Sequence, residues 1–139
     1  DELRLYALDR IKALEPTERK FKLPKKFDAA KFFEDYYGII IGDKDFDICP
    51  VALKVDSWQS KYFRTLPLHH SQVEVERNEE YSIFEYRLCP SFDFRQKILS
   101  MGATTEVLAP ATLIAKVREE GIAEYLQPDE DYEFKVYKK

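Results

Sequence analysis

The chain has 139 residues, and its 45% hydrophobic and 14% aromatic content is enough for one folded domain or a small domain with extensions. The 26 acidic residues outnumber the 22 basic ones, and the net charge of −4 argues against a chain that grips duplex DNA by itself. No apolar run approaches the roughly 18 residues of a membrane helix, and the opening sequence DELRLYALDR contains no secretion signal. We therefore expect a cytoplasmic protein without a membrane partner.

Residues 3–8 alternate between apolar and polar side chains, which predicts a β-strand that continues toward Leu14. No partner strand follows nearby, so this strand is expected to pair with a sheet that lies upstream. The chain begins inside the strand, and its only methionine is Met101. We therefore expect a fragment of a longer protein, in which residues 1–14 are the last strand of a truncated domain.

Residues 15–50 are interpreted as a linker with one helix, because residues 15–27 are polar and contain two prolines. Asp28 is expected to cap the helix and Gly38 to end it. Aromatic side chains cover one face of this helix, and either core packing or a ligand or partner surface explains them. They are Phe32, Phe33, Tyr36 and Tyr37.

Six further elements are expected between residues 51 and 108. Alternating apolar residues predict strands, and apolar residues at helical spacing predict helices. The expected order is a strand at 51–55, a helix at 57–66, strands at 72–77 and 81–88, a helix at 92–101 and a strand at 104–108. Ser91 is expected to cap the second helix. A last helix is expected from Pro110 to Gly121.

The pattern also predicts which side chains face the core. The apolar stripe of the 57–66 helix consists of Trp58, Tyr62, Phe63 and Leu66. In the hairpin, the side chains expected inward are Val73 and Val75 on the first strand and Phe84, Tyr86 and Leu88 on the second. Those expected outward are Glu74, Glu76, Glu85 and Arg87. This acid-leaning outer face suits the basic surface of a partner better than nucleic acid.

The order strand, helix, strand, strand, helix, strand predicts an α+β fold of the ferredoxin-like type, with an antiparallel sheet and the helices on one face. Right-handed crossovers leave few other topologies. Residues 51–121 would form this domain, and residues 122–139 would form a C-terminal tail. The alternation in YEFKVYK favours an edge strand in the tail or a strand that pairs with another copy.

The sequence contains no recognisable catalytic or metal pattern, so we expect no enzyme, no catalytic residue, no cofactor and no metal. His69 and His70 are the only histidines, and neither has a nucleophile at a recognisable spacing. Their spacing from Cys49 and Cys89 is not typical of zinc ligands, and the two cysteines are expected to be free thiols. The acidic loop at residues 42–47 lacks the remaining ligands of a calcium loop.

Five segments together resemble one known family. They are RLYALDRI (4–11), FDAAKFFEDYYGIIIG (27–42), LHHSQ (68–72), ILSMG (98–102) and EVLAPATL (106–113). The first is similar to the end of a WYL domain and the second to the linker helix of WYL-family regulators. The other three are similar to signatures of the C-terminal extension of that family, the WCX domain. His70 stands where proline is usual, and the Trp-Tyr-Leu motif itself does not occur in the chain.

The resemblance implies the C-terminal region of a bacterial transcriptional regulator. Such a regulator is expected to be a homodimer, to sense an effector that is a nucleotide or nucleic acid in some members, and to bind operator DNA only through a winged helix outside this chain. The first strand would be left from an Sm-like WYL barrel. By the motif, Arg10 corresponds to a basic residue of the effector site, and strict alternation places Arg4 and Tyr6 on the same strand face.

Two arginines and an aromatic ring on one strand face suit contact with phosphates and bases. Ordinary salt bridges at an exposed strand edge explain the same residues equally well. Two other functions also remain open: a ferredoxin-like domain that binds a small molecule without a role in DNA regulation, and an assembly domain that binds no ligand. A winged helix upstream of this chain would favour the regulator.

Overall fold

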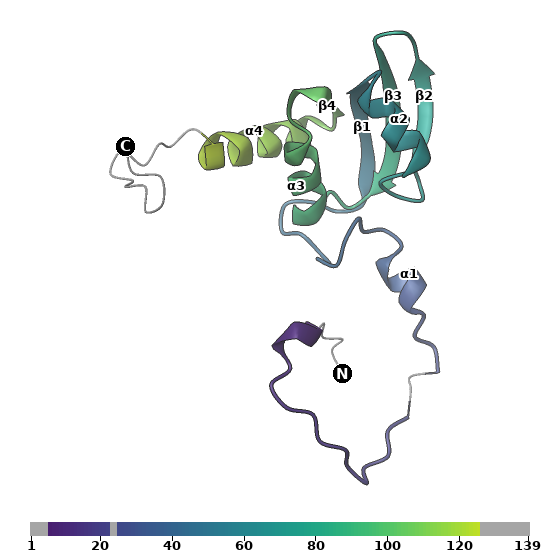
Figure 1. Ribbon diagram of the computed structural model, residues 1–139, viewed down its shortest axis with the longest axis vertical. Helices are drawn as coiled ribbons and strands as arrows, with labels where there is room; N and C mark the ends of the chain where they lie inside the picture. Colours follow the sequence, from purple (N-terminus) through teal and green to yellow (C-terminus); the bar gives the residue numbers. More distant parts are fainter. Residues whose placement is uncertain (1–5, 23–24, 126–139) are drawn as a thin grey trace, which may run out of the picture.

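One four-stranded antiparallel sheet forms the centre of the structure, a computed structural model that describes residues 6–22 and 25–125 (Figure 1). Its strands are β1 (Cys49–Asp56), β2 (Val73–Arg77), β3 (Tyr81–Leu88) and β4 (Thr105–Ala109), in the order β2-β3-β1-β4. β1 pairs with β3 and β4, and β2 pairs with β3, each time antiparallel. The helices are η1 (Leu8–Arg10), α1 (Ala29–Phe33), α2 (Gln59–Thr65), α3 (Phe92–Ser100), η2 (Gly102–Thr104) and α4 (Ala111–Tyr125). None of these described helices is long and apolar enough to cross a membrane.

The elements from β1 to β4 follow in the order that the apolar periodicity predicts, which gives a mixed α/β fold. Strand β1 buries every second side chain, Val51, Leu53 and Val55, against the helices. Asp56 then starts α2, because its Oδ1 accepts a hydrogen bond from the Gln59 backbone N–H at 2.6 Å.

Helices α2 and α3 pack on the same face of the sheet. Phe63 of α2 lies against Phe84 of β3, with ring centroids 5.2 Å apart. Phe94 of α3 lies against Tyr86, two residues further along β3, at 5.9 Å. Because alternate residues of a strand share a face, both helices cover one side of β3 and the core lies between them and the sheet. On the opposite face, the β1 and β3 side chains are half-buried or exposed within the described part of the chain.

Two of the predicted faces are wrong. In α2 only Phe63 enters the core, while Trp58, Tyr62 and Leu66 are 59%, 53% and 78% exposed. In β2 Val73 and Val75 are at least half exposed, because Val73 pairs with the outward-facing Glu85, and Val75, at which β2 bulges, lies two residues further along. The predicted outward residue Glu74 instead pairs with Phe84, on the helix-covered face. The amphipathic spacing therefore predicted that α2 and β2 exist, but it predicted the wrong core-facing side for each.

The segment before residue 34 lies away from the sheet, and every described residue from 6 to 31 is exposed (Figure 1). The strand expected over residues 3–8 and beyond is absent from residues 6–14, where Leu8–Arg10 forms a 3-10 turn. A strand needs a neighbour for its hydrogen bonds, and the described residues place none beside it. Asp28 caps α1 as predicted, accepting from the backbone N–H groups of Ala30 and Lys31.

Three predicted helix ends differ in detail. Helix α1 stops at Phe33, so Gly38 does not end it; a Cβ on Gly38 would lie 2.0 Å from Asp93 Oδ2, so close packing explains this glycine. Ser91 occupies the N-cap position of α3, but its side chain makes no capping hydrogen bond. Helix α4 continues past Gly121, where the missing side chain lets α4 approach Leu99 of α3. The strand expected in YEFKVYK lies outside the described residues.

Candidate functional site

The structure does not bring the three predicted effector residues together. Arg4 lies outside the described residues. Tyr6 is 79% exposed, and Arg10 is exposed at the end of η1. Neither side chain makes a hydrogen bond to another residue of the described ranges. Their role in effector binding therefore stays a prediction.

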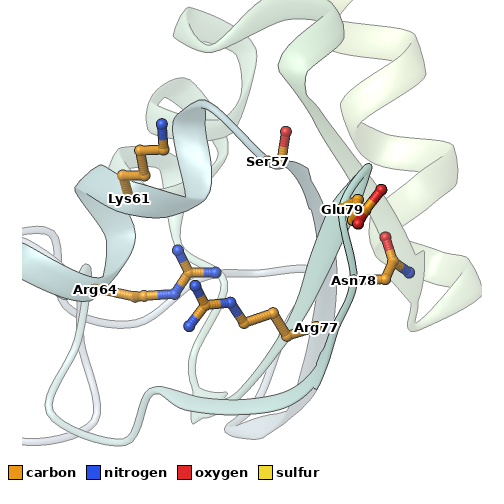
Figure 2. Close-up of a pocket in the computed structure, with 6 residues that line it drawn as sticks. All are labelled: Ser57, Lys61, Arg64, Arg77, Asn78 and Glu79. Carbon is orange, nitrogen blue, oxygen red and sulfur yellow. The ribbon is translucent and has the colours of Figure 1, made fainter.

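An open groove of about 590 Å³ lies between α2 and the end of the β2–β3 hairpin (Figure 2). Its lining is mostly polar and includes three cationic side chains. The lining residues are Ser57, Lys61, Arg64, Arg77, Asn78 and Glu79. Lys61 and Arg64 are three residues apart on α2, so the helix presents both on its side toward the hairpin. We call this hollow the cationic groove.

Arg64 is fixed in the cationic groove by a two-pronged pair with Glu74. Its Nε donates to both carboxylate oxygens at 3.1 and 3.0 Å, and its Nη2 donates to Oε1 at 2.6 Å. Nη2 also donates to Ser82 Oγ at 2.8 Å. The hydrogen bonds from Arg64 lower the pKa of Glu74, and those to Glu74 raise the pKa of Arg64. Both groups therefore remain charged at neutral pH, with the guanidinium plane held in one orientation.

The bulge in β2 brings Arg77 to the same groove. Before the bulge Glu74 pairs with Phe84, and after it Arg77 pairs with Ser82, so both lie on the helix-covered face. If Val75 took a regular place opposite Ile83 instead of being bulged out, Arg77 would lie opposite Tyr81, on the outer face. Figure 2 shows the guanidinium groups of Arg64 and Arg77 pointing toward each other across the groove. Redirecting a side chain in this way is a common role of bulges.

The chemistry of the groove is that of a binding site for anions. Arg77 and Lys61 form no ion pair with any residue of the described part of the chain. Ser57 and Asn78 add a hydroxyl and an amide, and Glu79 adds a carboxylate at the rim. No histidine or cysteine lines the groove, so its residues supply charge and hydrogen bonds rather than a nucleophile.

A second exposed feature, which we call the aromatic ridge, runs along α2 and consists of Trp58, Tyr62 and Leu66. The rings of Trp58 and Tyr62 pack edge to face at 5.0 Å. Beside the ridge a hollow of about 200 Å³ opens between α2, Tyr37 and Lys97. Exposed aromatic residues are frequent where proteins associate, because they bury much surface at low entropic cost.

The histidines join the linker to the hairpin. The Nε2 atom of His69 lies 2.8 Å from the carbonyl oxygen of Glu34, and that of His70 lies 2.7 Å from the same oxygen. Because a carbonyl oxygen can only accept, both rings donate from Nε2. His69 Nδ1 then accepts from the Ser71 hydroxyl at 2.8 Å, in the turn before β2. Burial lowers the pKa of His69 and favours its neutral form. These contacts are structural, and within the described ranges no group of acidic, histidine and cysteine residues is arranged to hold a metal.

Both cysteines are free thiols. Cys89 is buried and donates its S–H to the carbonyl oxygen of Phe46 at 3.4 Å. Burial raises the pKa of Cys49 and of Cys89, so neither thiol is activated as a nucleophile.

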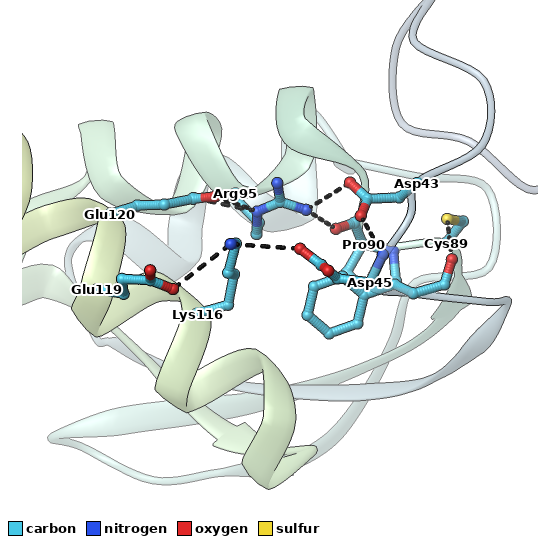
Figure 3. A network of polar contacts seen from close by, with 9 residues as sticks. Asp43, Asp45, Cys89, Pro90, Arg95, Lys116, Glu119 and Glu120 are labelled. Carbon is cyan, nitrogen blue, oxygen red and sulfur yellow. Dashed lines mark hydrogen bonds and ion pairs between the residues drawn. The ribbon is translucent and has the colours of Figure 1, made fainter.

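The acidic loop after Gly42 pairs with the cationic side chains of Arg95 and Lys116 (Figure 3). Arg95, only 4% exposed, donates from Nη1 to Asp43 Oδ2 and from Nε to Glu120 Oε1, both at 2.8 Å. Its Nη1 also donates to the Pro90 carbonyl oxygen at 2.8 Å. Lys116 pairs with Asp45 at 3.2 Å. The carboxylates that resemble a calcium loop in sequence are thus neutralised by α3 and α4.

The sequence interpretation missed the cationic groove. Lys61 and Arg64 stand three residues apart in the 57–66 helix, and this spacing was visible. Arg77 gave no such signal, because its place in the groove depends on the bulge at Val75. The prediction that the valines of this strand face inward also placed Glu74 outward, so it did not identify Glu74 as the partner of Arg64.

The chain was compared with curated proteins and with models of protein families. A search of curated proteins finds no match for this chain. A family model described as the WCX domain matches residues 47–123, which include all four strands and most of α4. The expected WCX resemblance is thereby confirmed, whereas no WYL domain is matched. Because the match covers more than half of the 139 residues, the chain belongs to the WCX domain family.

Proposed function

We propose that the chain is the C-terminal effector-sensing and dimerisation region of a bacterial WYL-family transcriptional regulator. The observation that carries this proposal is the WCX match over residues 47–123. In the intact regulator, a winged helix outside this chain binds operator DNA. The chain itself binds no duplex DNA and catalyses no reaction. The net charge of −4 supports the separation of the two roles. We place the regulator in the cytoplasm.

The same proposal assigns the sheet to the ferredoxin-like type. Its support is the order β2-β3-β1-β4 with every neighbouring pair antiparallel. The contacts of α2 and α3 with one side of β3 also support it. Such a sheet leaves its second face and the outer side of α2 available for a partner or ligand.

Dimerisation through the aromatic ridge is the first consequence to test. We expect light scattering of the 1–139 chain at high concentration to give the mass of a dimer. Replacing Trp58 and Tyr62 together by serine should give a monomer with an unchanged circular dichroism spectrum, because both side chains are more than half exposed and contribute little to the core. Leu108→Ser, at a 39% exposed position of β4, is the control and should remain dimeric. A monomeric wild-type chain would refute the dimer.

Effector sensing is tested in the full-length regulator with Arg10→Ala. We expect weaker induction of a reporter gene from the regulated promoter and unchanged operator binding in a gel-shift assay. Lys12→Ala removes a neighbouring exposed cation and should leave induction intact. Unchanged induction in the Arg10 variant would remove this residue from the effector site.

The alternative is a ferredoxin-like domain that binds a small molecule or mediates assembly without any part in DNA regulation. The cationic groove is compatible with this alternative, because it lies wholly within the WCX domain. Operator binding by the full-length protein, and its loss on deletion of an upstream winged helix, separates the two functions.

A further inference from the structure

The geometry points to a binding site for a small phosphate monoester in the cationic groove, with the guanidinium groups of Arg64 and Arg77 holding the phosphate. This inference is independent of the regulatory proposal, because it rests only on side chains of α2 and the β2–β3 hairpin. It names a ligand class for a surface that the family match leaves unassigned.

The first argument is the pairing of two like charges. Arg64 and Arg77 point their guanidinium groups at each other (Figure 2), and no carboxylate bridges the two within the described residues. Glu74 neutralises Arg64 through Nε and Nη2, which leaves Arg64 Nη1 without a hydrogen-bond partner among these residues. The Glu74 carboxylate attracts Arg77 only from a distance, so Arg77 keeps its donors free, and an anion between the two guanidinium groups can accept hydrogen bonds from both.

The second argument is preorganisation. Arg64 is locked by Glu74 and by the buried hydroxyl of Ser82, so little side-chain entropy is lost when it binds a ligand. Arg77 reaches the groove only because the bulge at Val75 changes the face on which it lies. The planar, forked donors of two arginines match the tetrahedral oxygens of a phosphate, and Arg77 and Lys61 supply positive charge beyond the one that Glu74 neutralises.

The third argument concerns the rest of the ligand. At about 590 Å³ the groove exceeds the space that a phosphate needs, so it has room for a sugar or a similar polar group. Lys61, Ser57 and Asn78 offer donors, and the carboxylate of Glu79 accepts hydrogen bonds from hydroxyl or amino groups. The same carboxylate repels a chain of phosphodiesters that extends past it. A compact monoester bearing hydroxyl groups therefore fits better than a nucleic-acid strand.

The test is a titration of the 15N-labelled 1–139 chain in phosphate-free buffer, followed by backbone amide shifts. The probes are ribose 5-phosphate, inorganic phosphate, ribose, and a five-nucleotide single strand without terminal phosphates. We expect saturable shifts at residues 57–64 and 77–79 with ribose 5-phosphate, weaker binding of inorganic phosphate at the same residues, and no shift with ribose. Tighter binding of the oligonucleotide than of ribose 5-phosphate would overturn the assignment to a monoester.

Variants identify the residues responsible. Arg77→Gln should weaken ribose 5-phosphate binding about tenfold or more, because it removes charge-assisted hydrogen bonds to the phosphate. Arg87→Gln removes the same charge from the outer side of β3, where the side chain is 72% exposed, and should leave the affinity unchanged. Equal weakening in both variants would show attraction by net charge alone and would refute the site. If ribose 5-phosphate causes no saturable shift in the wild-type chain at concentrations up to roughly 20 mM, above the millimolar dissociation constants of weak ligands, the site is also refuted.

Discussion

The linker that precedes β1 and the cationic groove handle polar groups in opposite ways. Residues 34–46 of the linker pack on the sheet domain through paired polar groups. Arg95 pairs with Asp43, Asp93 accepts from the Ile39 and Ile40 backbone N–H groups, and both histidines donate to the Glu34 carbonyl oxygen. In the groove, by contrast, Arg77 has no such partner in the described chain. Satisfied polar groups stabilise a fold, whereas excess donors at an open surface are available to a ligand.

The strongest test of this contrast is Arg95→Met. The substitution leaves Asp43 and Glu120 without their cation in a nearly buried position, so we expect the free energy of unfolding to fall by roughly 3–5 kcal/mol. Urea denaturation measures the change. Arg118→Met, at an exposed position of α4 with no ion pair among the described residues, is the matched control and should alter stability by less than about 0.5 kcal/mol. Similar losses in the two variants would mean that the seam contributes nothing specific.

A smaller effect is expected from pH at the same seam. Burial lowers the pKa of His69 below its usual 6.5, so the unfolded state binds more protons as the pH falls from 6.5 toward the folded value. The contribution of His69 is therefore complete above pH 6.5 and declines in more acidic solution. We expect unfolding free energies at pH 7.5 and 5.5 to differ less in His69→Gln, which keeps a donor for Glu34, than in the wild type. Equal differences in the wild type and in His69→Gln would contradict the assignment.

The smallest effect on stability is expected in the groove. Arg77→Gln removes a cation that faces Arg64, so the unfolding free energy without ligand should stay within about 0.5 kcal/mol of the wild type or rise slightly. Thermal melting in phosphate-free buffer is sufficient to measure this. A loss comparable to that of Arg95→Met would reveal a structural partner for Arg77 and would weaken the contrast between the two regions.

The sequence predicts the elements better than it predicts their faces. Strand β1 was readable because Val51, Leu53 and Val55 alternate without interruption. Helix α2 was misjudged because Trp58, Tyr62 and Leu66 share a side, and spacing alone does not say which side meets the sheet. Ser60 is buried and donates to the Val55 carbonyl oxygen at 3.0 Å, at a position that the predicted apolar stripe did not include.

The candidate sites show a sharper limit. Arg4, Tyr6 and Arg10 were chosen from a sequence resemblance, and the described residues bring no groups together around Tyr6 and Arg10. Arg64 and Arg77 line the same groove because of a one-residue bulge in β2. Such a register shift depends on tertiary contacts, such as the pairing of Glu74 with Arg64 of α2, rather than on local propensity. Patterns read along the chain therefore find the helix side of the groove and miss the strand side.

The irregularity in β2 has a consequence beyond ligand binding. In the described sheet, β2 is an edge strand, paired only with β3. A flat, regular edge strand offers its unpaired backbone N–H and C=O groups to a strand of another molecule. The extra residue Val75 breaks that regularity, and the neighbouring Glu76 adds charge beside it. The two exposed valines of this edge strand therefore lie where the backbone resists strand-by-strand fibre growth, so the chain carries apolar side chains there without offering a regular edge.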